Sequence, residues 1–194
     1  MRSRIASKLF LASIALIALT LGADHAIAAE ISGVKLPDQV TVQGETLKLN
    51  GTGLRQATIL KINAYAAGLY LKNGMHDGEA IANSEQPKSI EMVFMRDVTA
   101  KQMSDAFQDG FDKNCIAGCA ELKPYIPKLQ GLMKDMKKGE TMAYHFLDDG
   151  VEVMIRGQKV GKVGDKAFSH QLIRVWIGKN PPNSELKEGL VGKK

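Results

Sequence analysis

The chain has 194 residues, of which 24% are charged, and its formal net charge is +5 at pH 7. This length is sufficient for one domain with a hydrophobic core of its own. Because the positive excess is mild and no basic run is interleaved with aromatic residues, nucleic-acid binding has no support and no nucleic-acid partner is expected.

Residues 1–28 have the order of a secretory signal peptide. Three basic residues precede an apolar run from Leu9 to Leu21, and a small-residue sequence, Ala-Ile-Ala, ends at Ala28. The apolar run is shorter than the ~20 residues that span a bilayer. We therefore predict cleavage after Ala28, which leaves residues 29–194 as a single exported domain in the periplasm or outside the cell, with no stable membrane span. The alternative is an uncleaved membrane anchor.

Alternating apolar residues predict β-structure in the first half of the exported domain. In VTVQGETLKLNG, residues 40–51, apolar residues alternate on both sides of Gln43-Gly44-Glu45, which predicts a hairpin. The stretch GTGLRQATILKINAYAAGLYL, residues 51–71, is predicted to continue as one strand. The segment KSIEMVFMRDV, residues 88–98, predicts a further strand, and a short helix is expected before it, near residues 79–83.

Two helices are predicted between residues 99 and 136. Thr99 and Gln102 have the spacing of a capping box, in which the hydroxyl and the amide satisfy backbone groups where a helix begins. Apolar residues then recur at helical spacing at Met103, Ala106, Phe107 and Phe111. The second helix is predicted to carry Tyr125, Ile126, Leu129, Leu132 and Met136.

The last part of the chain returns to strands and ends in a helix. Residues 140–164 alternate in polarity and are interrupted by Asp149-Gly150 and Gly157, which are typical of turns. Asp165 can cap a helix with apolar residues at Phe168, Leu172, Ile173, Val175 and Trp176. Strands followed by helices, then strands, then helices predict an α+β fold, with an antiparallel sheet covered on one face by helices.

The two cysteines, Cys115 and Cys119, are predicted to form a disulfide. Their spacing differs from the CxxC of redox and haem motifs, and no second Cys/His pair completes a zinc site. An oxidising compartment favours a short disulfide loop, with two free thiols as the alternative. His145 and His170 lie far apart in sequence without ligand-like partners, so we expect no metal and no cofactor.

Arg55 and Tyr65 are candidate binding residues because they interrupt an apolar stretch of small residues. A buried guanidinium is costly unless an anion meets it, and a tyrosine hydroxyl in an apolar wall needs a hydrogen-bond partner. Together they could hold a carboxylate, while their small neighbours leave room for an aliphatic tail. The alternative places Arg55 in solvent at a strand end and Tyr65 in the core.

The predicted single strand conflicts with a shared ligand. A straight strand rises ~3.3 Å per residue, which would separate Arg55 and Tyr65 by roughly 33 Å. They can meet only if the chain turns back near Leu60. The segment ATILKI, however, contains no Gly, Pro, Asn or Asp to form that turn easily.

Three segments together resemble the chalcone isomerase family, in its bacterial exported branch. They are GTGLRQATILKINAYAAGLYL, MRDVTAKQMSDAFQDGF and AFSHQLIRVWIGKNPPNSELKEGLVG, and the similarity extends from about Gly44 to Lys193. The resemblance implies an open-faced β-sandwich with a long antiparallel sheet, helices on one face and a ligand cleft between them.

The family includes isomerases, which close a chalcone to a flavanone, and non-catalytic relatives that bind fatty acids. In the isomerases an Arg in a GxGxR segment stabilises the phenolate, and a Thr on the next strand and a Tyr on the first helix order water against the ketone. Arg55 matches that Arg, whereas Tyr65 stands in place of the Thr and Met103 in place of the Tyr. A Lys and an Asn further along the helix fall on Ala106 and Gly110.

Without those polar groups the water network and the carbonyl activation of the isomerases are missing. The pairing of Arg55 with Tyr65 resembles the fatty-acid binders, and Ser169 approximates a family Ser or Thr beside the cleft. We expect a periplasmic protein that binds a fatty acid or similar carboxylate-bearing apolar ligand through Arg55, Tyr65, Met103 and Ser169, without turnover. The alternatives are an isomerase or lyase that acts on a chalcone-like phenolic substrate with Arg55 as its catalytic residue, and an envelope accessory protein that works through protein contacts.

Overall fold

The computed structural model describes residues 27–57 and 62–193. The basic and apolar parts of the predicted signal peptide lie outside the described residues, as do residues 58–61. The first strand, β1 (Ile27–Ile31), contains the predicted cleavage position after Ala28. Across the described ranges, no helix has both the length and the apolar character that crossing a membrane requires.

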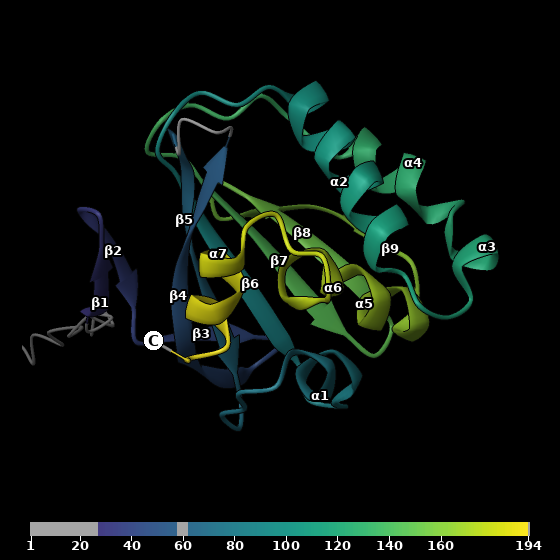
Figure 1. Ribbon diagram of the computed structural model, residues 1–194, viewed down its shortest axis with the longest axis horizontal. Coiled ribbons are helices and arrows are strands. Elements are labelled where there is room, and N and C mark those ends of the chain that lie inside the picture. Colours follow the sequence, from purple (N-terminus) through teal and green to yellow (C-terminus); the bar gives the residue numbers. More distant parts are fainter. Residues whose placement is uncertain (1–26, 58–61, 194) are drawn as a thin grey trace, which may run out of the picture.

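In the described part of the chain, seven antiparallel strands form one sheet (Figure 1). Strands that follow one another in sequence also lie side by side, as is usual for antiparallel sheets. A separate hairpin of β1 and β2 (Val34–Pro37) packs beside β4. The strands of the sheet, in spatial order, are β3 (Gln39–Val42), β4 (Glu45–Ala57), β5 (Ile62–Leu71), β6 (Lys88–Phe94), β7 (Thr141–Leu147), β8 (Gly150–Ile155) and β9 (Gln158–Val163).

Helices cover one face of this sheet (Figure 1). The helix α2 is the longest of those described and lies across the sheet, while α7 packs directly on β4. The predicted α+β fold, with an antiparallel sheet covered on one face, is confirmed. The helices are α1 (Gly78–Asn83), α2 (Ala100–Asn114), α3 (Cys119–Leu122), α4 (Tyr125–Gly131), α5 (Lys166–Leu172), α6 (Arg174–Ile177) and α7 (Ser184–Leu190).

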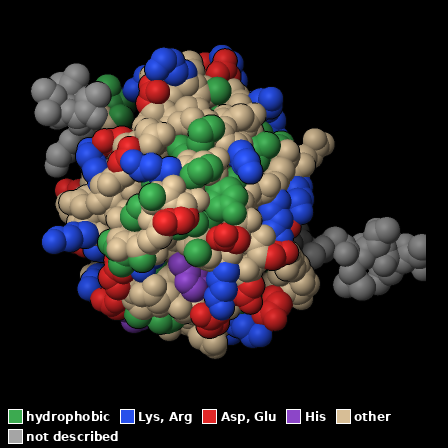
Figure 2. Space-filling view, turned by 90° about the vertical axis from the view of Figure 1, so that its right-hand side faces the viewer, with side chains coloured by type: hydrophobic (Ala, Val, Ile, Leu, Met, Phe, Trp, Pro, Cys, Tyr) green, Lys and Arg blue, Asp and Glu red, His purple; other side chains and the backbone are tan. Residues whose placement is uncertain are grey.

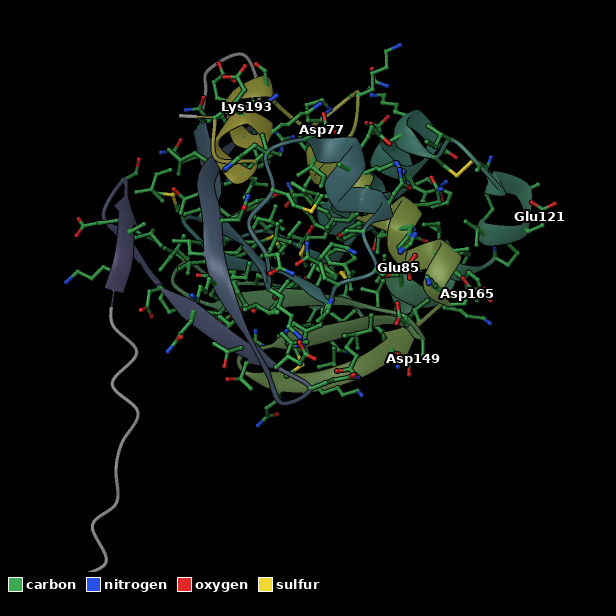
Figure 3. All side chains as sticks on the ribbon, turned by 90° about the horizontal axis from the view of Figure 1, so that it is seen from below. Asp77, Glu85, Glu121, Asp149, Asp165 and Lys193 are labelled. Carbon is green, nitrogen blue, oxygen red and sulfur yellow. A yellow bond between two sulfur atoms is a disulfide. The ribbon has the colours of Figure 1, made fainter. Side chains whose placement is uncertain are left out.

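The main hydrophobic core fills the space between the sheet and these helices (Figure 3). Five of its aromatic side chains are at most 2% exposed: Phe111, Tyr144, Phe146, Phe168 and Trp176. Full burial of a side chain of this size stabilises the fold by about 2 kcal/mol. Seen from the side of α3 and α4, the surface carries interspersed positive and negative side chains around scattered hydrophobic ones (Figure 2).

The predicted hairpin at residues 40–51 is present. Val42 pairs with Glu45, so the turn consists of Gln43 and Gly44, whose φ angles are 49° and 83°. Two successive positive φ angles are typical of a type I′ turn, which matches the twist of the strands that it joins. The same strands place Val42 in a smaller cluster of buried residues on the opposite face of the sheet, together with Leu47, Tyr70 and Leu147.

The prediction of one continuous strand over residues 51–71 is wrong. β4 ends at Ala57, β5 begins at Ile62, and the two strands are antiparallel, so the chain reverses direction between them. Arg55 and Tyr65 are consequently direct cross-strand partners. Alternation of side chains has the same period in either direction of the chain, and therefore could not reveal this reversal.

The helix α2 begins where it was predicted to begin, whereas α4 ends earlier than predicted. In the capping box, Thr99 Oγ1 accepts from Gln102 N (3.2 Å) and Thr99 N donates to Gln102 Oε1 (2.9 Å). The second predicted helix is shorter than expected, because α4 ends at Gly131, and Met136 instead forms an isolated β-bridge with Val98.

The predicted C-terminal helix is divided in two. Asp165 caps α5 by accepting from Phe168 N (2.9 Å), as predicted. The helix is then interrupted at Ile173, after which α6 begins. A further helix, α7, was not predicted. It lies so close to β4 that a Cβ added at Gly189 would overlap Thr52 O, and one added at Gly51 would overlap Gly189 O.

The sulfur atoms of Cys115 and Cys119 are bonded in the structure, and the bond lies near Glu121 in Figure 3. Cys115 is the C-cap residue that follows α2, and Cys119 is the first residue of α3. The disulfide therefore closes a short loop that joins the two helices.

Lys88 is a buried cation at the start of β6. Its side chain is 2% exposed, and Nζ donates hydrogen bonds to the carbonyl oxygens of Ser84 (2.6 Å) and Gln86 (3.1 Å). Burial lowers the pKa of Lys88 to about 8, although the negative charges of Asp148 and Glu85 oppose the shift. Folding therefore disfavours the charged form of this amine.

We expect the stability of the wild-type protein, relative to a Lys88→Met variant, to rise by about 2 kcal/mol between about pH 7 and about pH 9.5. The folded protein releases the Lys88 proton above about pH 8, whereas the unfolded chain keeps it. The unfolded state therefore binds more protons in this interval, and stability increases with pH. Urea denaturation at both pH values measures the change.

A Lys101→Met variant is the matched control, since the Lys101 side chain is 81% exposed. Its stability difference from the wild type should be the same at both pH values. An equally constant difference for Lys88→Met would contradict the prediction.

Candidate functional site

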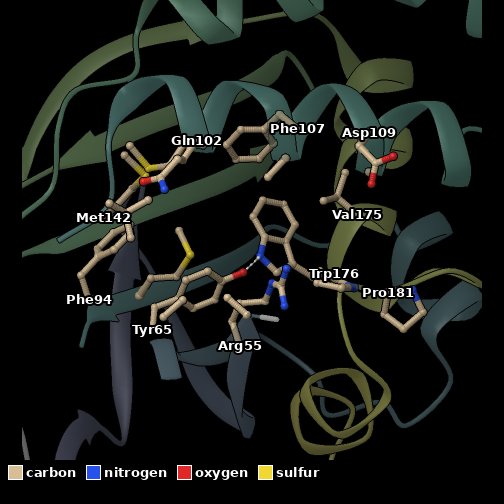
Figure 4. Close-up of a pocket in the computed structure, with 18 of the residues that line it drawn as sticks. Arg55, Tyr65, Phe94, Gln102, Phe107, Asp109, Met142, Val175, Trp176 and Pro181 are labelled. Atoms are coloured by element: carbon tan, nitrogen blue, oxygen red, sulfur yellow. Dashed lines mark hydrogen bonds between the residues drawn. The ribbon is translucent and has the colours of Figure 1, made fainter. Parts of the chain in front are cut away.

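A cavity of about 610 Å³ opens between α2 and the sheet, near the ends of β4, β5 and β6 (Figure 4). Its volume lies in the range of small-molecule sites, which are mostly apolar with a few polar groups. The cavity has an apolar inner wall, a polar end and a charged rim. The inner wall includes Phe94, Met103, Phe107, Met142, Val175 and Trp176.

Residues from the helices α2 and α6 form much of the apolar wall. On α2, Met103, Ala106 and Gly110 recur at intervals of three and four residues and so lie on one face, toward the sheet. A Cβ at Gly110 would come within 2.7 Å of Val175, so this glycine allows α2 to lie close to α6. The aromatic ring of Trp176, from α6, forms the floor beside Phe107, with ring centroids 5.6 Å apart.

Arg55 and Tyr65 form the polar end of the cavity. Because they are cross-strand partners, their side chains leave the sheet on the same face, and in Figure 4 both point toward Trp176. Trp176 Nε1 donates a hydrogen bond to Tyr65 Oη (3.1 Å), and Arg55 donates to Gln56 O.

Burial raises the pKa of Tyr65 to about 12, although the Arg55 guanidinium and the hydrogen bond from Trp176 oppose the shift. The Tyr65 hydroxyl is therefore neutral near physiological pH and keeps its hydrogen.

The backbone on both sides of Arg55 is held by Asn183. Its Oδ1 accepts from Gln56 N (3.1 Å), and its Nδ2 donates to Leu54 O (3.0 Å). The strand β3 pairs with β4 only as far as Lys48, so among the described strands none lies beside this edge of β4. The Asn183 amide satisfies backbone groups there as a strand would.

The rim of the cavity is predominantly cationic. Arg96 and Lys113 line it, next to Arg55 at the polar end, and among the described lining residues Asp109 is the single carboxylate. Lys113 Nζ lies 2.7 Å from Asp109 Oδ2, so these two charges compensate each other. The remaining positive charge favours the approach of an anionic group.

Arg55, Tyr65 and Met103, three of the residues singled out from the sequence, all line the cavity. Ser169 does not. It is 1% exposed and belongs to α5, next to Phe168, which packs in the core. The break at Ile173 separates α5 from α6. Of these two helices, α6 contributes residues to the cavity lining, namely Val175 and Trp176, and α5 does not.

Two residues of the site were missed as functional residues. Trp176 was predicted only as an apolar helix residue, and its indole N–H gave no sequence signal of a contact with Tyr65. Asn183 precedes Ser184-Glu185, a pattern that indicates a helix start but not a bond to a distant strand.

The positions expected for polar catalytic groups on α2 are occupied by Met103, Ala106 and Gly110, all of which line the cavity. In the residues that the structure covers, no group of three or more His, Cys, Asp or Glu side chains could hold a metal ion. The arrangement that is present can donate hydrogen bonds to an anion and surround an apolar tail.

Comparison with known proteins agrees with this architecture. A family model described as chalcone isomerase-like matches residues 28–192. A comparison with curated protein sequences found no match. The chain is similar to the crystal structure of a fatty-acid binding protein from Arabidopsis thaliana, with a TM-score of 0.63 and 17% identity, covering 83% of this chain and 93% of that one. At this identity the likeness shows the fold, which is the one that the sequence resemblance implied.

Proposed function

Because the chain belongs to the chalcone isomerase-like family, we propose that it is a non-catalytic binding protein for a fatty acid or a similar carboxylate-bearing apolar ligand. The observation that carries the proposal is the position of Arg55 and Tyr65 at one end of an otherwise apolar cavity. A carboxylate there would accept charge-assisted hydrogen bonds from the guanidinium and a further bond from the phenol.

The rest of the cavity suits the tail of such a ligand. Thioether and aromatic side chains line it, and methionine adapts to flexible aliphatic chains. The structurally similar Arabidopsis protein is a fatty-acid binding protein, which supports the same ligand class. The apolar residues on α2, where isomerases of this family carry polar groups, support binding without turnover.

We also propose that the protein acts in the periplasm or outside the cell. The support is the order of basic, apolar and small residues in positions 1–28. A binding protein in such a compartment could carry an apolar acid through water by enclosing its tail.

Native mass spectrometry of the protein purified from cells tests these proposals. We expect a one-to-one complex with a fatty acid and a polypeptide mass that corresponds to a chain beginning at Ala29. Calorimetric titration of delipidated protein with saturated fatty acids, from octanoate to octadecanoate, should show saturable binding.

Two results would contradict the binding proposal. One is delipidated protein that binds no acid in the series. The other is measurable cyclisation of a chalcone by the wild-type protein, which would favour the isomerase alternative.

A further inference from the structure

The hydrogen bond between Trp176 and Tyr65 restricts the direction of the tyrosine hydroxyl. An indole nitrogen is only a donor, so Trp176 Nε1–H must donate and Tyr65 Oη, 3.1 Å away, must accept. The phenolic hydrogen is then left to donate in another direction. Among the described residues, no hydrogen-bond acceptor receives it.

Trp176 is held rigidly enough to impose this direction. The side chain is 2% exposed, and its ring contacts three other aromatic rings. The centroid distances are 5.6 Å to Phe107, 5.3 Å to Tyr144 and 6.1 Å to Phe146. An indole that is packed on several sides cannot turn its N–H away from Tyr65 without disturbing the core.

Arg55 adds further donors beside Tyr65. A guanidinium carries five N–H groups and no acceptor. One N–H donates to Gln56 O, and within the described ranges Arg55 forms no ion pair. The polar end of the cavity therefore presents donors from both side chains.

Two side chains on the rim of the cavity, Gln102 and Asp109, carry acceptor oxygens. Gln102 Oε1 accepts from Thr99 N (2.9 Å), and Asp109 Oδ2 accepts from Lys113 Nζ (2.7 Å). In Figure 4 both of these side chains lie away from the hydrogen-bonded pair of Tyr65 and Trp176, so they do not place an acceptor beside Tyr65 Oη.

We propose that this donor-only end selects a deprotonated head group over an alcohol of the same chain length, and that Trp176 is the positioning residue for the selection. The inference rests on the proposed function, because it concerns the same cavity. A carboxylate can accept from Tyr65 and Arg55 together. An alcohol brings a hydrogen that would be buried without a partner, which weakens binding by about tenfold.

The test compares dodecanoate with dodecanol in displacing a fluorescent fatty acid from delipidated protein. Trp176→Phe keeps an aromatic ring in the core but removes the N–H, so Tyr65 Oη becomes free to accept from an alcohol. We expect the preference for the acid over the alcohol to fall by about tenfold in Trp176→Phe. In a Tyr65→Phe background, Trp176→Phe should leave that preference unchanged.

Phe107→Leu is the matched control, because it alters the packing around the indole without touching the hydrogen bond. It should weaken both ligands by the same factor. If Trp176→Phe also lowers both affinities equally, Trp176 has only a packing role and the inference is overturned, while the proposed function stands. If the wild-type protein binds neither ligand and no other fatty acid, the proposed function itself fails.

Discussion

Replacement of Arg55 by methionine is expected to weaken the binding of a fatty acid by about 100-fold, because charge-assisted hydrogen bonds contribute about 1.5–3 kcal/mol. Methionine retains much of the length of the side chain and removes its charge. In the described residues Arg55 has no ion-pair partner, so its replacement leaves no buried carboxylate without a counter-charge. The free energy of unfolding should therefore change by less than about 1 kcal/mol. Calorimetric titration and urea denaturation measure the two quantities.

Arg96→Met is the control for this experiment. Arg96 also lines the cavity but lies exposed at the rim, where water and salt screen its charge. We expect its loss to weaken binding by less than about fivefold. Equal effects of the two substitutions would show that the head group does not lie against Arg55.

Gly189→Ala is expected to lower the free energy of unfolding by about 3 kcal/mol, the upper part of the range for overpacked sites. The added methyl group would overlap Thr52 O, and the backbone of β4 cannot move away as a flexible side chain could. α7 must therefore shift, and its buried residues Leu186 and Leu190 lose contact with the core. Urea denaturation measures the loss, and ligand titration should show weaker binding because Asn183 moves with the helix.

Gly131→Ala provides the matched control. Gly131 is the last residue of α4, and a Cβ there would meet no atom within 4 Å. Alanine favours the helix over glycine, so this variant should be as stable as the wild type or more stable by about 0.5 kcal/mol. A cost below about 1 kcal/mol for Gly189→Ala would contradict the close approach of α7 to β4.

Local signals in the sequence were sufficient for much of the fold. The turn at Gln43-Gly44 and the capping box of Thr99 and Gln102 involve only residues that are close in sequence. The hairpin and the start of α2 could therefore be predicted. The reversal after Ala57 could not, because the pattern of apolar residues is compatible with either direction of the strand. The ends of α4 and α5 depend on tertiary packing rather than on caps.

The site was predictable only in part for a similar reason. Arg55 and Tyr65 stand out because their chemistry conflicts with an apolar environment. Trp176 and Asn183 act through contacts across 111 and 127 residues, and neither contact leaves a trace in the neighbouring sequence. The family resemblance predicted Ser169 beside the cleft. In the structure the helix is interrupted at Ile173, and Ser169 lies buried on α5, away from the cavity.

The dependence of β4 on Asn183 also sets the order in which the site can be assembled. A chain that emerges N-terminus first presents Arg55 on a strand edge without its partner until the segment 127 residues later has been synthesised. A chain truncated before Asn183 would leave Gln56 N and Leu54 O, on either side of Arg55, without these hydrogen bonds. The backbone that carries Arg55 is therefore fully hydrogen-bonded only in a chain that includes Asn183.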